Sequence, residues 1–402
     1  MVGIPRYRPH AGPALFSAGF RPFFLAAALW AALAVPLWLA AYGRGAVAAS
    51  VLPPALWHGH EMVFGFAIAS VAGFLLTAIP NWTGRMPLQG WPLAALVLLW
   101  AAGRLAVLGS AAIGAPAAAA IDLAFPLAFL LTIAREILAG RNWRNLPMLA
   151  ALALLLLGSL LVHLEALGVA QTGELGNRLG LATLLMLISL MGGRIIPSFT
   201  RNWLVKMRPQ ERLPAAAGVL DAATLVLTGL GLAAWVGAPD GEWTPWAELL
   251  AGIAVAVRLA RWRGLATMRE PLLVVLHVGY AWLACGLLLL AFNGLWALMP
   301  ASDAVHALTI GAVGTMTLAV MTRASLGHTG RPLAAGPGTK AIFLLITAAA
   351  LLRLAVALSG GRTELLLWLA GLAWSGAFGL FALFYGRPLS RPRISGTAAP
   401  PI

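Results

Sequence analysis

The run WHGHEMVFGFAIASVAGFLLTAIP, Trp57 to Pro80, decides the class of fold, because it is long and apolar enough to cross a bilayer. It opens with two histidines and a glutamate, His58, His60 and Glu61. Ionisable side chains at the boundary of a membrane span are costly and usually have a functional reason. We therefore expect a membrane helix whose first turn carries chemistry.

Similar apolar runs recur along the 402 residues, of which 61% are hydrophobic and only 10% are charged. Soluble domains carry about 25% charged residues. We therefore predict an all-α integral membrane protein with about twelve transmembrane helices. The predicted spans are residues 23–42, 60–80, 91–110, 116–137, 147–167, 179–199, 216–237, 246–260, 271–291, 303–324, 340–358 and 364–386.

The net charge of +14 is a topology signal, because the basic residues follow the order of the spans. They gather before the first span and in the connections after even-numbered spans. The positive-inside rule then places both termini in the cytoplasm. The expected partner is the lipid bilayer, and nucleic acid is not expected.

Parts of the sequence repeat at a long interval. His60 precedes Thr83 of "TGRMPL" by 23 residues, and His306 precedes Thr329 of "TGRPL" by the same 23 residues. Such self-similarity indicates repeated structural units. We predict an N-terminal tail (1–22), one transmembrane domain (23–386) with four-helix repeats at about 23–140, 145–262 and 270–386, and a disordered C-terminal tail (387–402). Three sets of four helices resemble the pseudo-threefold catalytic subunit of haem-copper oxidases.

Four histidines fall at the outer ends of predicted spans: His58, His60, His163 and His306. If the helix already runs at Trp57, His58 and Glu61 share a face, and His60 points about 200° away. If it begins only at His60, both imidazoles can reach one metal. Histidine is also tolerated at membrane interfaces without binding a metal. His277 lies near the cytoplasmic end of its span.

Two buried arginines, Arg104 and Arg353, occupy equivalent places in the first and third predicted repeats. A guanidinium at that depth needs an anionic partner. Haem propionates would supply one. The alternative partners are acidic residues near the same membrane face, namely Asp122, Glu165, Glu248 and Asp303.

The motifs together resemble the NnrS family over nearly the whole length. They include "GFRPFF" (19–24), "WHGHEMVFGF" (57–66), "GGRIIPSFTRNWL" (192–204) and the run from His306 to Leu333. The resemblance implies a bacterial inner-membrane protein that carries haem and copper and is linked to nitric oxide and nitrosative stress. It also implies His58, His60, His277 and His306 as metal ligands. No Cys-x-x-Cys-His occurs, so the haem would be a non-covalent haem b.

We expect reduction of nitric oxide to nitrous oxide, with Glu61 as the proton donor or a ligand of a second metal, and with a quinol or a cytochrome as the electron donor. The cofactor-binding residues would be His58, His277, His306, Arg104 and Arg353. Two other functions fit the same sequence. One is a non-catalytic haem-based sensor or buffer of nitric oxide, and the other is a permease that handles metal or haem.

Overall fold

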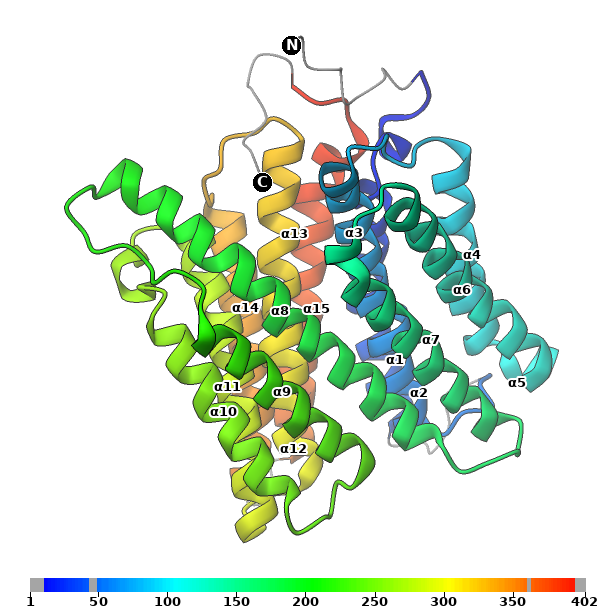
Figure 1. Cartoon of the computed structure of the whole chain (residues 1–402). Coiled ribbons are helices and arrows are strands. Elements are labelled where there is room, and N and C mark those ends of the chain that lie inside the picture. The colour runs from blue at the N-terminus through cyan, green and yellow to red at the C-terminus, as the bar shows by residue number, and fades with distance from the viewer. Residues whose placement is uncertain (1–10, 43–48, 360–362, 395–402) are drawn as a thin grey trace. The chain divides into compact units, whose positions relative to one another are not determined.

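The computed structural model describes residues 11–42, 49–359 and 363–394, and every regular element among them is a helix (Figure 1). His10 and the outer parts of both predicted tails lie outside the described residues. The predicted all-α class is confirmed.

Eleven described helical segments are long and apolar enough to cross a membrane. They match eleven of the predicted spans. The remaining span, predicted at 246–260, is helix α10 (Thr244–Ala260), whose 17 residues are at the lower limit of about 17 for a crossing. The chain is therefore a multi-pass membrane protein.

The chain forms two compact units, which we describe separately. Unit 1 comprises the described residues of Met1–Gly180, Ala324–Pro332 and Phe381–Ile402. Within it α1 packs on α3, α4 on α6, and α6 on α7. Its elements are η1 (Ala14–Phe16), α1 (Phe20–Tyr42), α2 (Pro54–His60), η2 (Glu61–Ala67), α3 (Ile68–Thr83), α4 (Trp91–Leu108), α5 (Ser110–Ile113), α6 (Ala115–Ala139), η3 (Trp143–Asn145) and α7 (Leu146–Ala166).

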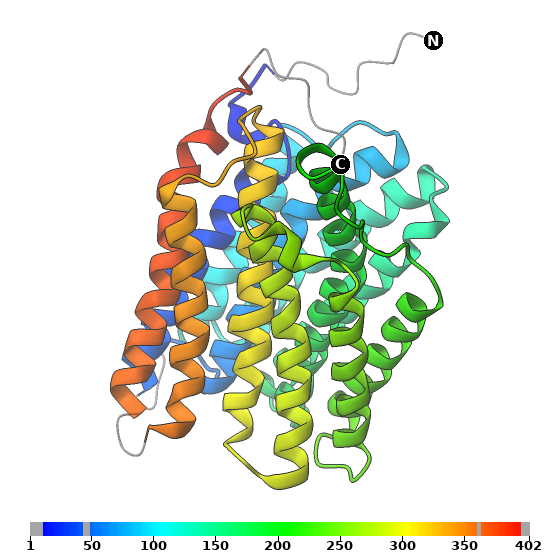
Figure 2. The same ribbon diagram turned by 90° about the vertical axis from the view of Figure 1, so that its left-hand side faces the viewer.

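Unit 2 comprises the described residues of Leu181–Arg323 and Leu333–Leu380. Helices α9, α10 and α11 pack in sequence, and η5 packs on α11 and α14 (Figure 2). Helices α8, α13 and α15 each have their last or first residues in unit 1. The elements that lie wholly or mainly in unit 2 are α8 (Gly173–Met207), α9 (Val219–Gly237), α10, η4 (Gly264–Thr267), α11 (Pro271–Trp296), α12 (Ala301–His306), η5 (Ala307–Gly314), α13 (Thr315–His328), α14 (Pro337–Ala355), η6 (Val356–Leu358) and α15 (Thr363–Ser390).

Proline and glycine set many of the helix ends. Proline stands in the first turn of α2, α4, α6, α7, α10, α11 and α14, where its missing N–H costs no hydrogen bond. Gly84 ends α3 in a left-handed conformation with φ +70°. Helix α15 continues to Ser390, past the predicted boundary at 386. Leu389 is fully buried, so this part of the predicted tail is ordered.

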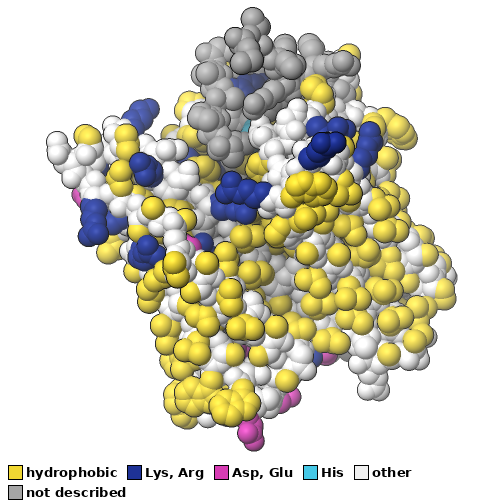
Figure 3. Space-filling view, in the orientation of Figure 1, with side chains coloured by type: hydrophobic (Ala, Val, Ile, Leu, Met, Phe, Trp, Pro, Cys, Tyr) yellow, Lys and Arg dark blue, Asp and Glu magenta, His cyan; other side chains and the backbone are white. Residues whose placement is uncertain are grey.

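Aromatic side chains fill the core of unit 1, while leucines cover its outside. Phe125 stacks on Phe129 with ring centroids 5.8 Å apart, and Phe23 lies against Phe125. Leu33, Leu105 and many other large apolar side chains are exposed, as expected of a surface that faces lipid. Figure 3 shows hydrophobic side chains over much of the visible surface.

Two of the membrane segments contain a π-helical stretch at matching places. Segment η2 begins immediately after His60, and segment η5 begins immediately after His306. Short π-helices inside α-helices often mark functional sites. The matching positions agree with a relationship between the first and third predicted repeats. The threefold repeat and its likeness to haem-copper oxidases stay predictions.

Candidate metal centre

The change from α- to π-helix places His60 and Glu61 in one buried cluster. Pro54 begins α2, so the chain is already helical at Trp57, and His60 is the last α-helical residue. Both His60 and Glu61 are completely buried. The glutamate folds back toward its neighbour, with Oε1 lying 3.1 Å from His60 Nδ1. The sequence left open whether Glu61 shares a site with His58, and in the structure Glu61 contacts His60 and Arg104.

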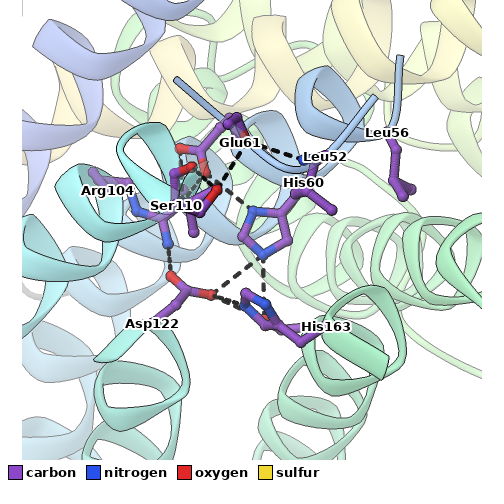
Figure 4. A network of polar contacts seen from close by, with 12 residues as sticks. Leu52, Leu56, His60, Glu61, Arg104, Ser110, Asp122 and His163 are labelled. Carbon is purple, nitrogen blue, oxygen red and sulfur yellow. Dashed lines mark hydrogen bonds and ion pairs between the residues drawn. The ribbon is translucent and has the colours of Figure 1, made fainter. Parts of the chain in front are cut away.

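Asp122, on α6, connects this pair to two side chains on α7 (Figure 4). Asp122 Oδ2 lies 3.2 Å from His60 Nε2 and 2.9 Å from His163 Nε2. It also accepts a hydrogen bond from Ser159 Oγ at 3.2 Å. These side chains are at most 3% exposed. One carboxylate oxygen thus lies between two imidazole nitrogens inside the protein.

Arg104, on α4, forms ion pairs with the carboxylates of both Glu61 and Asp122. Its Nη1 donates to both oxygens of Glu61 at 2.8 Å, and its Nη2 pairs with Asp122 Oδ1. The alternative partner predicted for this arginine, an acidic side chain, is the one that the structure shows. A guanidinium bridging two buried carboxylates compensates the cost of burying all three charges.

The donor set fits a small cation. Ligand atoms of His60, Asp122 and His163 all lie within 4.8 Å of one another. Two imidazoles and one carboxylate are a ligand set typical of redox-active and other transition metals. With neutral imidazoles the two carboxylates and Arg104 sum to a net charge of −1, so the cluster attracts one further positive charge. A buried carboxylate pair of this kind is stabilised by a bound cation.

The cluster does not fit haem. Both ring nitrogens of His60 face carboxylates, whereas an axial ligand must point one nitrogen at the iron of a porphyrin. His163 Nε2 faces Asp122 in the same way. His60 Nε2 and His163 Nε2 both lie close to one carboxylate oxygen, which leaves a site for a single ion rather than for a porphyrin. The proposed chemistry therefore does not depend on haem.

The other predicted ligands have different contacts. His58 stacks on Trp38, with ring centroids 4.4 Å apart. In unit 2, His277 donates from Nδ1 to Leu273 O at 3.0 Å and accepts at Nε2 from Thr200 at 3.5 Å. Both of its nitrogens are therefore engaged within the protein.

His306 and Arg353 lie at the far end of α11 from His277. His306 donates from Nδ1 to Ser302 O at 2.5 Å. Arg353 Nη1 pairs with Asp303 Oδ1 at 2.6 Å. The partner of this arginine is thus one of the predicted acidic side chains, as it is for Arg104. Along α11, His277 and Trp296 are about 28 Å apart at 1.5 Å per residue. Unit 2 thus does not bring His277 and His306 to one metal.

Two members of the cluster, Asp122 and Ser159, were not predicted as site residues, and His163 was noted only for its place at a span end. One signal pointed to α7: Ser159 and His163 are four residues apart and so share a helix face. A polar pair on one face of an apolar helix indicates a buried partner. The sequence did not show that this partner is Asp122.

Gly65, in η2, leaves room for the charged cluster, and a methyl group there is expected to disturb it. A Cβ atom at this position would lie 2.7 Å from Arg104 Nη1 and 2.9 Å from Glu61 Oε2. We expect Gly65→Ala to lower stability by about 1–3 kcal/mol, the usual cost of overpacking. Thermal unfolding in detergent measures it. Gly229→Ala is the control, because nothing lies within 4 Å of that Cβ, and it should unfold at or above the wild-type temperature.

Comparison with known protein families identifies the chain's family. A family model described as NnrS protein matches residues 14–393, which contain every residue of the buried cluster. No curated protein matches the sequence. The resemblance seen in the motifs is thereby confirmed. Because the match covers nearly the whole chain, the chain belongs to the NnrS family and is a membrane protein related to nitric oxide.

Proposed function

We propose that this protein reduces nitric oxide to nitrous oxide at a metal ion held by His60, Asp122 and His163. The observation that carries the proposal is the convergence of these three ligand atoms in a buried, net negative cluster of an NnrS protein. A copper or iron ion bound there would supply a site for nitric oxide and a route for electrons. Copper agrees with the copper implied by the resemblance.

The protein groups have distinct roles in this proposal. The reaction combines two NO with two protons and two electrons to give N2O and water. His60, His163 and Asp122 would hold the ion, and Glu61 would accept the N–H of His60 at Nδ1. Such a carboxylate fixes the tautomer and the orientation of a ligating histidine. We also assign to Glu61, a buried carboxylate beside His60, the delivery of protons to the oxygen that leaves as water.

Arg104 holds the Glu61 carboxylate in place, because its guanidinium donates to both oxygens of the glutamate. In this proposal Glu61 acts as a proton relay. The electrons come from a quinol in the bilayer or from a cytochrome. Haem b, with His58 or His306 as its axial ligand, remains part of the proposal only through the family. The same holds for an inner-membrane location with both termini in the cytoplasm.

Metal content and turnover of the purified protein test the proposal. We expect copper or iron in stoichiometric amount, and repeated NO consumption with N2O formation when a quinol analogue is supplied. His60→Ala and His163→Ala should lose the ion and the activity, while His328→Ala, outside the cluster, should keep both. Metal-free wild-type protein would contradict the proposal. An ion with a single NO uptake per chain would favour a sensor or buffer, and metal uptake into vesicles without N2O would favour a permease.

A further inference from the structure

Four basic side chains gather at one end of unit 1, away from the metal centre: Arg21, His328, Arg331 and Arg393. We call them the basic cluster. They come from the start of α1, from the "GHTGRP" turn that follows α13, and from the segment after α15. The sequence brings them to the end of the spans where basic residues collect, but the positive-inside rule does not require that they meet.

The guanidinium of Arg21 forms its hydrogen bonds within the chain itself. It is 4% exposed, and its Nη1 donates to Leu389 O at 2.8 Å and to Arg391 O at 2.6 Å. Both carbonyls belong to the C-terminal end of α15, where a helix carries partial negative charge. Arg21 thus fixes the end of α15 and the segment that follows it.

The other members of the cluster are held close to Arg21. Ile394 N donates to Thr329 O at 3.1 Å, which places the Arg393 segment against the turn. The ring of His328 lies 5.3 Å from the Phe20 ring, next to Arg21 along the chain. Arg331 and Arg21 are close enough to repel each other, and His328 is repelled by Arg21 and Arg393.

No carboxylate forms an ion pair with Arg21, His328 or Arg331 in the part of the chain that the structure describes. In particular, Arg331 Nη1 is buried and has no hydrogen-bond acceptor among the described residues. An unsatisfied buried donor is costly, and more so when it is charged. The geometry therefore calls for an external anion with several acceptor oxygens.

We propose that the basic cluster binds a phosphate group, which in the membrane is the headgroup phosphate of an anionic lipid. Guanidinium groups match the geometry of phosphate oxygens, and basic pockets between helix ends near the membrane surface bind such headgroups. Arg331 Nη1 is the donor that would contact the phosphate, with Arg393 and His328 beside it. The proposal is independent of the metal centre.

The test compares lipid binding by the full-length wild type, Arg331→Gln, and the matched control Arg135→Gln. Arg135 is exposed, with 77% of its side chain accessible, so the control removes the same charge without touching the cluster. Each protein is placed in nanodiscs of phosphatidylcholine with increasing phosphatidylglycerol. Native mass spectrometry measures the retained lipid, and thermal unfolding measures stabilisation.

We expect wild type and Arg135→Gln to retain phosphatidylglycerol selectively, and Arg331→Gln to bind it about tenfold or more weakly. Thermal unfolding of Arg331→Gln in pure phosphatidylcholine separates loss of binding from loss of folding. Stabilisation of wild type by inorganic phosphate in detergent, absent in Arg331→Gln and without lipid selectivity, would support a soluble phosphate as the source. Equal lipid retention by all three proteins would overturn the proposal.

Discussion

Replacing Asp122 by asparagine is expected to release the bound metal ion and to lower the thermal stability of the protein. The substitution removes the carboxylate oxygen that lies close to both His60 Nε2 and His163 Nε2. Loss of a residue that only hydrogen-bonds to a metal ligand lowers metal affinity about 10–100-fold. Loss of the ligand itself should therefore lower metal affinity more than about 100-fold. Metal content after gel filtration measures this loss.

The stability loss has a separate cause, and a matched variant isolates it. Asp122→Asn also leaves Arg104 with one carboxylate instead of two, and breaking a buried ion pair costs about 3–5 kcal/mol. Asp303→Asn breaks the pair with Arg353 in unit 2, whose two side chains are at most 10% exposed and do not belong to the group of His60, Asp122 and His163. We expect it to lower the unfolding temperature while metal content stays at the wild-type level. Metal loss in both variants would show that unfolding, not ligand loss, releases the ion.

Hydropathy predicted the membrane spans because crossing a bilayer needs a long apolar run, which the sequence displays directly. The same reasoning found His60 and Glu61, since an ionisable side chain in such a run has few structural explanations. It also predicted that Arg104 is buried beside an anion. These results depend on properties of single segments.

What the sequence did not predict depends on contacts between segments. Whether Arg104 meets a cofactor or an acid is decided by the packing of α4 on α6, which brings Asp122 next to it. The π-helical turn at Glu61 was not predicted because apolar periodicity does not distinguish it from an α-helix. Glu61, the first residue of that turn, contacts His60.

Replacing Glu61 by glutamine is expected to have the largest effect on activity, slowing NO turnover by about 100- to 10,000-fold, the range attributed to a positioned proton-transfer group. Glutamine keeps the size of the side chain and still offers an oxygen to His60 Nδ1. It cannot carry a proton to the reacting oxygen. Steady-state NO consumption with an electrode, and N2O by gas chromatography, measure the loss.

Adding excess metal to the Glu61→Gln variant distinguishes two roles of Glu61 by their effect on NO turnover. If Glu61 only orients His60, Glu61→Gln binds the ion about 10–100-fold more weakly, and excess metal restores turnover. If Glu61 also relays protons, the fully loaded variant remains slow. Glu248→Gln is the control, because Glu248 is a similarly buried glutamate on α10 in unit 2. The Glu248→Gln protein should consume NO at the wild-type rate. Restored turnover in fully loaded Glu61→Gln would reduce Glu61 to a positioning residue, and the protons would then have to reach the ion by another route.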